Sequence, residues 1–322
     1  MHFNGLISYI AFTKNNTGIS SMLWVLGLFA LFASLFTLSK FALAFTAPFF
    51  LIGSRMFVAG LVLLAWEAWR SGGIKIRKEA MGALVLLALT GIYITNIAEI
   101  WGMQYMPSAK ACLVYSLSPF VAAFLAFCVL GEKLTNKKWL GLVIGFMGLL
   151  PILFVPQAES IEWLSFKLPE LAIVVAVFAS SLGWILLKKT TQTFSCSVWL
   201  ANGVSMLIGG GLALLHSWLA GEVWAPFPIT PGQELVFVES MVVMLLVSNV
   251  ICYNLYGFLL KRFSATFMSF AGLVTPFFAS LFGWLWLEES IYWQYWVAMT
   301  LFALGLWVFY QEERLPEAVE AP

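Results

Sequence analysis

Ser118-Pro119-Phe120, followed by Gly131-Glu132, Trp139 and Gly148, forms a stretch that occurs twice in this chain. A shift of 157 residues, without a gap, superimposes it on Thr275-Pro276-Phe277, Glu288-Glu289, Trp296 and Gly305. The identical pairs are Pro119/Pro276, Phe120/Phe277, Ala122/Ala279, Leu130/Leu287, Glu132/Glu289, Trp139/Trp296, Gly148/Gly305 and Leu149/Leu306. A gapless series that pairs a mid-segment proline, an acidic break and a tryptophan indicates an internal repeat.

The composition around this repeat is that of an integral membrane protein. Of 322 residues, 61% are apolar and 10% are charged, and the mean hydropathy is +0.92. Soluble domains carry about 25% charged residues, so soluble fold classes are excluded. The net charge of +1 gives no reason to expect a nucleic-acid partner. The four cysteines show neither disulfide nor zinc spacing, and we expect no metal and no cofactor.

Apolar runs divide the chain into predicted membrane-spanning helices, each of which needs about 20 residues. The sequence predicts an all-α integral membrane fold with ten transmembrane helices, at residues 21–43, 48–69, 79–103, 107–130, 138–155, 168–187, 196–219, 235–259, 264–287 and 291–311. Residues 1–20 are predicted to be a cytoplasmic tail, because their apolar run is too short to span and no cleavage site follows it. Residues 156–167 are predicted to be an external loop, and 312–322 a cytoplasmic tail.

The distribution of Lys and Arg predicts the orientation of these helices. If the N-terminus is cytoplasmic, only Lys110 and Lys167 fall in external loops. The loops that then face the cytoplasm carry Lys14, Arg70, Lys75, Arg77, Lys78, Lys133, Lys137, Lys138, Lys188, Lys189, Lys261, Arg262 and Arg314. Since cytoplasmic loops carry the excess of basic residues, both termini are predicted to be cytoplasmic.

Each copy of the repeat, 21–155 and 168–311, holds five predicted helices. Because five is odd, the second copy enters the membrane in the opposite orientation. Inverted repeats of this kind are typical of secondary transporters, whose substrate site lies near the midplane between the repeats.

The sequence resembles the drug/metabolite transporter superfamily, in particular its EamA-type members, over residues 21–311. The stretches that carry the resemblance are Ser-Arg-Met-Phe-Val-Ala-Gly at 54–60, Tyr105 to Lys110 followed by Ser118-Pro119-Phe120, and the breaks at Gly131-Glu132 and Glu288-Glu289. The resemblance implies a plasma-membrane metabolite carrier, commonly an exporter of amino acids or related small molecules, with a cavity lined by both repeats. In the second repeat, Ser205 is nearest by pattern to Arg55.

Arg55 and Glu99 are charged residues inside predicted spans, where a charge costs about 2.5–3.5 kcal/mol on insertion scales. Arg55 could anchor a substrate carboxylate through its planar fork, or it could be structural, pairing with Glu99 or reaching outward. Tyr93, Asn96 and Glu99 share a helix face. Glu99 could bind an ammonium group or carry a coupled proton, or it could form an ion pair with Arg55 or Lys110.

Three further stripes of polar and aromatic residues could line a water-filled cavity. They are Asn249, Tyr253 and Tyr256 in helix 235–259; Ser181, Trp184 and Lys188 along helix 168–187, a stripe that ends in cytoplasmic charge; and Ser108, Cys112, Tyr115 and Pro119 in helix 107–130, where Ser118 is also a candidate for binding substrate. Asn254 is expected to point away from its stripe. Each stripe could instead supply hydrogen bonds between helices, which are common in membrane proteins.

The repeated prolines and glutamates allow two interpretations each. Pro119 and Pro276 are expected in mid-helix, as hinges or as static kinks. Glu132 and Glu289 suit the start of the following helix, where the dipole favours an acid, and a gate contact is the alternative. Gly141 and Gly145 allow close packing, within the chain or between copies, so the chain is expected to be a monomer or a homodimer.

Together these features predict a secondary transporter that moves a small polar or amphipathic metabolite by alternating access, with export as the expected direction. The expected partners are the substrate, the lipid bilayer and, if transport is proton-coupled, protons. The alternatives are a channel or a non-transporting scaffold. A membrane enzyme is less well supported, because the sequence contains no catalytic set such as His-Glu-x-x-His.

Overall fold

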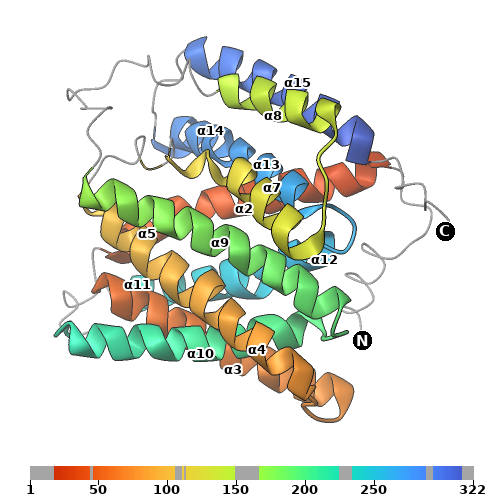
Figure 1. The fold of residues 1–322 in the computed structure, drawn as a ribbon. Helices are drawn as coiled ribbons and strands as arrows, with labels where there is room; N and C mark the ends of the chain where they lie inside the picture. The colour runs from red at the N-terminus through yellow and green to blue at the C-terminus, as the bar shows by residue number, and fades with distance from the viewer. Residues whose placement is uncertain are drawn as a thin grey trace.

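The computed structural model describes residues 18–43, 46–105, 111, 114–148, 167–224, 234–287 and 293–313. Within these ranges every regular element is a helix (Figure 1). Most of the predicted terminal tails and of the predicted external loop lie outside them, as do Ser108, Lys110, Cys112 and the second acidic break at Glu288-Glu289.

The helices follow the predicted repeat closely. The first copy contains α2 (Gly18–Leu43), α3 (Pro48–Ser71), α4 (Lys78–Leu87), the π-helix η1 (Ala88–Ile94), α5 (Thr95–Met103), α7 (Ser118–Leu130) and α8 (Asn136–Met147). The second contains α9 (Leu168–Gln192), α10 (Val198–Leu219), α11 (Glu234–Met244), the π-helix η3 (Leu245–Cys252), α12 (Tyr253–Leu259), α13 (Ala265–Ala271), the 3₁₀ turn η4 (Gly272–Val274), α14 (Thr275–Leu287) and α15 (Trp293–Glu313). Helices α7 and α14 match at both ends after the shift of 157 residues, and η1 and η3 begin at matching positions.

Several of these helices are long and apolar enough to cross a bilayer. In the described residues they are the stretches Pro48–Ser71, Lys78–Met103, Leu168–Gln192, Val198–Leu219 and Phe237–Leu259. Shorter apolar helices occupy Ser21–Ser34, Ser118–Leu130 and Ala265–Phe278. The chain is therefore a multi-pass helical membrane protein.

The structure corrects the expected position of one of the two repeated prolines. Pro119 lies in the first turn of α7, directly after a turn at Ser116–Leu117, and Pro276 is the second residue of α14, after the 3₁₀ turn η4. Proline is tolerated in a first turn because the N–H it lacks would have no intrahelical partner there. Pro119 therefore begins a helical segment, whereas Pro276, although it begins α14, stays inside one apolar helical stretch, Ala265–Phe278, as predicted.

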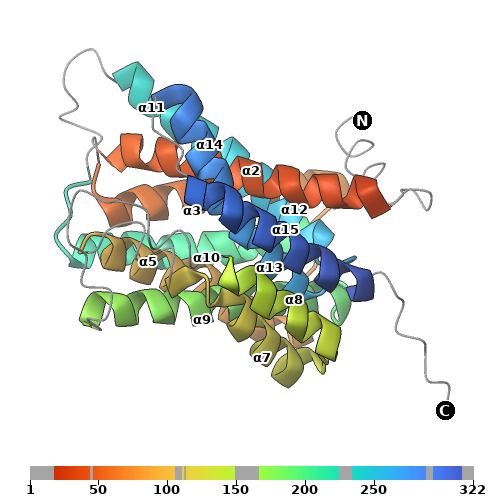
Figure 2. The same ribbon diagram turned by 90° about the horizontal axis from the view of Figure 1, so that it is seen from above.

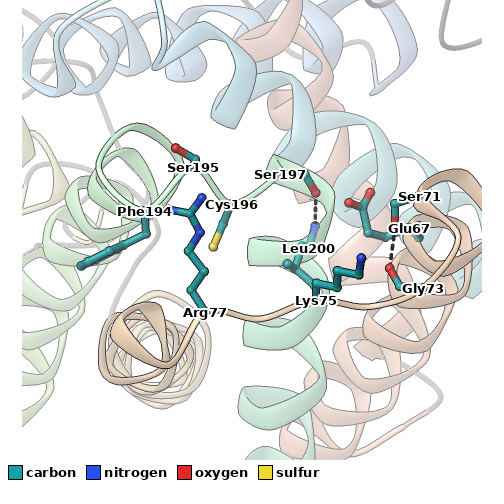
Figure 3. Close-up of a pocket in the computed structure, with 10 residues that line it drawn as sticks. All are labelled: Glu67, Ser71, Gly73, Lys75, Arg77, Phe194, Ser195, Cys196, Ser197 and Leu200. Carbon is teal, nitrogen blue, oxygen red and sulfur yellow. Dashed lines mark hydrogen bonds between the residues drawn. The ribbon is translucent and has the colours of Figure 1, made fainter.

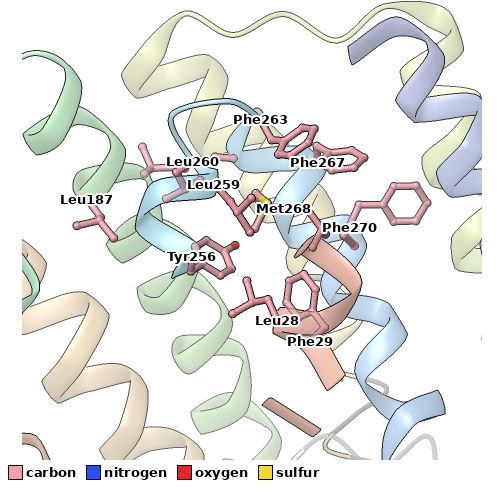
Figure 4. Close-up of a cluster of buried hydrophobic side chains, with 14 of the residues drawn as sticks. Leu28, Phe29, Leu187, Tyr256, Leu259, Leu260, Phe263, Phe267, Met268 and Phe270 are labelled. Carbon is pink, nitrogen blue, oxygen red and sulfur yellow. The ribbon is translucent and has the colours of Figure 1, made fainter. Parts of the chain in front are cut away.

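The first helix of each repeat packs with the other repeat. Helix α9 lies against α4, η1, α5 and α7, and we call these helices together with α9 bundle A. Helix α2 lies against α11, η3, α12, α13 and α14, and we call these helices together with α2 bundle B. Figure 4 shows part of this exchange, with Leu28 and Phe29 of α2 packed among Tyr256 of α12 and Phe270 of α13. Each bundle therefore combines helices from both halves of the sequence.

Two further helix pairs join the repeats directly. Helices α8 and α15 lie side by side in both views (Figures 1 and 2), and α3 packs along α10. On α8 an added Cβ at Gly141 would lie 2.7 Å from the Gly305 carbonyl oxygen, and one at Gly148 would lie 3.0 Å from that of Ala298. From Gly141 to Gly148 the chain runs forward, while the residue contacted on α15 moves back from Gly305 to Ala298, so the two helices are antiparallel.

The glycine contacts occur in pairs related by the shift of 157 residues. The shift converts the Gly141–Gly305 contact into the contact between Ala298 and Gly148. On the other pair, Gly53 of α3 abuts Leu214 of α10. The related contact, between Gly210 of α10 and Phe57 of α3, is also present. Reciprocal contacts of this kind are what a two-fold axis produces.

Polar contacts gather several loops at one end of the bundle, which we call the lysine-rich end. It comprises residues 131–138, 188–197, 260–264 and the last turn of α15. Lys138 pairs with Glu313 at 3.0 Å, Glu313 also accepts from the Ser264 backbone N–H, and Arg262 donates to Ser21 at 3.0 Å. Hydrogen bonds from Lys137 and Thr135 lower the pKa of the exposed Glu312 carboxyl.

At the opposite end, Glu222 caps helix α3 from the loop after α10. Its carboxylate accepts hydrogen bonds from the backbone N–H groups of Phe49 and Phe50, at 3.1 and 2.8 Å, and from the Ser217 hydroxyl at 2.7 Å. The first N–H groups of a helix have no intrahelical partner, and the residue before α3, Ala47, has no side chain that could serve. An acid from the partner helix therefore supplies this cap.

The glycine contacts predict the effect of adding one methyl group. In Gly305→Ala the new Cβ would lie 2.6 Å from the Gly141 oxygen and the Gly145 nitrogen, which are backbone atoms that cannot move aside. We expect a loss of about 1–3 kcal/mol, typical of overpacking, seen as a lower melting temperature in detergent. The control Gly82→Ala meets no atom within 4 Å and should melt at or slightly above the parent temperature. Equal melting of both variants would contradict this account.

Candidate functional site

Six of the residues singled out from the sequence meet inside the bundle. We call Arg55, Asn96, Glu99, Tyr115, Trp184 and Tyr253 the central cluster. The Tyr115 hydroxyl donates to Glu99 Oε2 at 2.9 Å, and the Tyr253 hydroxyl hydrogen-bonds the side chain of Asn96. Arg55 interacts electrostatically with both Glu99 and Tyr253.

The contact between Asn96 and Tyr253 locates this cluster. These two residues are related by the shift of 157 residues, so each is the other's counterpart. In a pair of repeats related by a two-fold axis, a contact between counterparts must lie on the axis. The central cluster therefore lies where counterpart residues from the two halves of the chain meet.

The guanidinium of Arg55 is buried without a carboxylate in contact. Its Nη1 lies 3.6 Å from the Met244 sulfur, and its Nε has no hydrogen-bond partner. The closely paired Arg55–Glu99 arrangement, one of the two interpretations of the sequence, is not what the side chains form. An unsatisfied, buried Arg donor is costly, so this atom marks a place where a ligand oxygen would be stabilised.

The second repeat has no equivalent of this charge. The residue related to Arg55 by the shift is Leu212, not Ser205. Ser205 is fully buried, and its hydroxyl donates to the Asn202 carbonyl one turn back on the same helix, at 3.0 Å. The charged side of the central cluster thus belongs to the first repeat alone.

Aromatic rings form the opposite side. Trp184 stacks on Tyr256, with ring centroids 3.8 Å apart and planes 21° from parallel, and it lies 5.2 Å from Tyr253. From α2, Phe29 meets Tyr256 edge-on and Phe32 meets Tyr253 in the same way. We call Trp184, Tyr253 and Tyr256 the aromatic wall.

Two asparagines that sequence reasoning did not assign to the site hold this part of the second repeat. Asn202 of α10 donates to the Tyr253 carbonyl and to Asn254 Oδ1, both at 3.1 Å, and Asn254 donates to the Val250 carbonyl at 2.8 Å. A π-helix such as η3 leaves carbonyls without their usual partners, and these amides supply donors. Asn249 lies at the same place, with Nδ2 2.8 Å from the Met56 sulfur and a buried Oδ1 that has no partner.

The remaining predicted residues lie around the cluster rather than in it. The Tyr93 hydroxyl lies 3.0 Å from His216 Nδ1, near the C-terminal end of α10. Ser181 is buried on α9, one turn before Trp184, and Ser118 is the first residue of α7. His216 and Glu222 were missed because their partners are remote in sequence.

The structure contains two cavities of interest. A small one, about 10 Å³, borders the central cluster between Gly91, Gly183, Trp184, Asn202 and Tyr253. The larger, about 210 Å³, extends from the lysine-rich end (Figure 3). It is lined by Glu67, Ser71, Gly73, Lys75, Arg77, Phe194, Ser195, Cys196, Ser197 and Leu200, none of which was predicted to bind substrate. The described residues contain no group of His, Cys, Asp and Glu side chains that could hold a metal ion.

The helices and the polar cluster at their centre define a multi-pass membrane protein with an internal polar site. Residues 19–154 and 167–311 each match the EamA-like transporter family. The chain belongs to this family, which confirms the resemblance predicted from the sequence.

Individual relatives agree with this assignment. The chain is 40% identical to the S-adenosylmethionine/S-adenosylhomocysteine transporter of Chlamydia muridarum over 286 residues, which is 88% of this chain and 89% of the relative. It is also 40% identical to the protein of that name from Chlamydia trachomatis serovar L2, over 88% of this chain and 86% of the relative. A crystal structure with 16% identity superposes with a TM-score of 0.68, over 91% of this chain and 96% of the other, and shows the fold alone. The chain is a transporter of a small metabolite.

The asparagine contacts predict that Asn202→Leu lowers the stability of the protein more than Ser205→Ala does. Asn202→Leu leaves the Tyr253 carbonyl and Asn254 Oδ1 without their donor, which costs about 1–3 kcal/mol for buried groups. Ser205→Ala removes only a bond within α10 and should change stability by less than about 1 kcal/mol. Thermal unfolding of the two variants in detergent measures the difference. A Ser205→Ala loss as large as that of Asn202→Leu would refute the proposed role of Asn202.

Proposed function

We propose that this chain carries S-adenosylmethionine and related adenosyl amino acids across the membrane by alternating access. The observation that carries the proposal is the central cluster, in which an unsatisfied Arg, a nearby Glu and an aromatic wall lie where counterpart residues of the two repeats meet. The names of two relatives at 40% identity supply the substrate class.

The proposed architecture is ten transmembrane helices in two inverted five-helix repeats, 21–155 and 168–311. The antiparallel glycine contacts support it, because repeats of the same orientation would place the related helices α8 and α15 parallel. The matching bounds of α7 and α14 support it as well. In this architecture substrate binds near the membrane midplane, where the two repeats meet.

The proposed orientation places the lysine-rich end in the cytoplasm of a bacterial cell, with both chain termini on that side. The positive-inside rule supports this placement, since that end gathers Lys137, Lys138, Lys188, Lys189 and Lys261. The described ends of the chain also lie at the lysine-rich end, since Ser21 accepts a hydrogen bond from Arg262 and Glu313 accepts one from the Ser264 backbone N–H.

The charges of the central cluster fit an α-amino acid group. Such a group carries a carboxylate and an ammonium on one carbon atom, so its site needs opposite charges that are near each other but not in direct contact. Arg55 offers a planar fork to the carboxylate, and Glu99, oriented by Tyr115, offers an acceptor to the ammonium. An incoming substrate would also bond the Nε of Arg55 that is now without a partner.

The aromatic wall fits the rest of the substrate. Adenine has a flat π-face that stacks well on Trp and Tyr, with about 1–3 kcal/mol per base in other proteins. A sulfonium is a soft cation that is attracted to the faces of such rings. Trp184 and Tyr253 are the members of the wall next to the charged residues.

Transport by variants in proteoliposomes tests this assignment. Arg55→Gln and Glu99→Gln should each lower the uptake of labelled S-adenosylmethionine at least about tenfold, because each leaves one substrate charge unpaired in a buried site. The matched control is Arg77→Gln, which removes an arginine of the larger cavity and should leave uptake within about twofold. Normal uptake by Arg55→Gln would exclude Arg55 as the carboxylate anchor.

The same variants distinguish which positive charge Glu99 recognises. S-adenosylhomocysteine keeps the ammonium but lacks the sulfonium. If Glu99 binds the ammonium, Glu99→Gln should weaken inhibition of uptake by both compounds equally. Loss for S-adenosylmethionine alone would assign Glu99 to the sulfonium instead. Export as the direction of transport and Glu99 as a proton carrier stay predictions, which uptake with and without an imposed proton gradient would test.

A further inference from the structure

The two bundles meet at the lysine-rich end. There α7 and α9 of bundle A pack against α13 of bundle B, and α9 also contacts α12. The described helices of the two bundles therefore pack directly on each other at this end.

A buried lysine lies at this point of closure. Lys188, on α9, is only 9% exposed. Its Nζ lies 2.5 Å from Glu132 Oε1, within bundle A, and donates to the Phe263 carbonyl of bundle B at 3.3 Å. One turn later Gln192 donates to the Leu260 carbonyl at 3.4 Å. The α12–α13 turn is thus held by two side chains of α9.

The contact of Lys188 with the Phe263 carbonyl depends on the negative charge of Glu132. An ammonium is stable in a buried position only when a counter-charge and hydrogen bonds replace its hydration. Glu132 supplies the counter-charge, and its other oxygen is itself buried without a hydrogen-bond partner. Removing Glu132 leaves the buried ammonium of Lys188 unpaired, and removing Lys188 leaves the partly exposed carboxylate of Glu132 without its counter-charge. Separating the bundles would let water reach either group.

The repeat does not supply the same side chains in the first half of the chain. The residues related to Lys188 and Gln192 by the shift are Leu31 and Leu35, which are apolar. The corresponding position at the opposite end therefore has no side-chain cation or amide to hold a turn. A polar closure of the lysine-rich end is a property of this sequence rather than of the two-fold fold.

We propose that Lys188, neutralised by Glu132, is the gate that closes the substrate pathway at the lysine-rich end, by holding the turn between α12 and α13. The proposal rests on alternating access, the mechanism proposed above. Glu132 thereby acquires a role beyond a helix terminus, and Gln192 is a second, uncharged element of the same gate.

Accessibility of the centre from the lysine-rich end tests the gate without any substrate. The reporter is Ser181→Cys, one turn from Trp184, in a chain whose native cysteines are replaced by serine. An impermeant maleimide is applied to that end in oriented vesicles. Lys188→Met and Glu132→Gln should each raise the labelling rate about tenfold, because the first removes the contact with the Phe263 carbonyl together with the counter-charge of Glu132, and the second leaves the buried Lys188 ammonium unpaired in the closed state. The double variant, which leaves neither charge, should return toward the parent rate.

Controls separate this gate from nonspecific loosening and from the substrate assignment. Lys189→Met, the adjacent lysine, should label at the parent rate, and Gln192→Leu should label about two- to threefold faster, since it loses one neutral hydrogen bond. If Lys188→Met does not fold, Glu132→Gln and Gln192→Leu still carry the test. Equal labelling of all variants, or a double variant as fast as the singles, overturns the gate. If uptake of S-adenosylmethionine is intact in that case, the proposed function stands without it.

Discussion

Backbone-to-backbone contact at glycines is the constraint on which the rest of the structure depends. Within a bilayer, lipid tails are as apolar as the helices, so helices associate through close packing rather than through the exclusion of water. Gly53 and Gly210 allow α3 and α10 to meet, and Gly141 and Gly305 do the same for α8 and α15. Each contact recurs in its repeat-related form, so these pairs hold the two halves of the chain together around the central cluster. The polar residues of the central cluster meet because glycines elsewhere in these helices let the helices pack closely.

Much of the helical framework could be predicted from the sequence. The shift of 157 residues anticipated the matching bounds of α7 and α14, since proline and glycine act on the local backbone. The π-helices η1 and η3 were not predicted, because an apolar run has the same composition in either kind of helix. They explain why Tyr93 lies apart from Asn96 and Glu99. Tyr93 lies within η1, whereas Asn96 and Glu99 lie in α5, which begins at Thr95. A π-helix has more residues per turn than an α-helix, so the face that residues spaced by three share in a regular α-helix does not continue from α5 into η1.

The candidate site was predictable where a residue violated the apolar pattern of its own helix. Arg55, Glu99, Tyr115 and Trp184 stood out in this way, and the structure brings them together. Asn202 and Glu222 were missed because their roles depend on partners from other helices, the Tyr253 carbonyl and the N-terminus of α3. Spacing along one helix contains no information about such partners. The asymmetry of Arg55 was predictable from the sequence alone, because the shift pairs it with Leu212.

The exchange of first helices between the bundles has a consequence for how the chain is made. Helix α2 is synthesised before its packing partners, α11 to α14, which all lie in the second half of the chain. Helix α2 therefore stays incompletely packed in the membrane until the second half of the chain has been synthesised. Helix α9, which belongs to the second half, packs with helices of the first half and completes bundle A. Neither half contains a finished bundle.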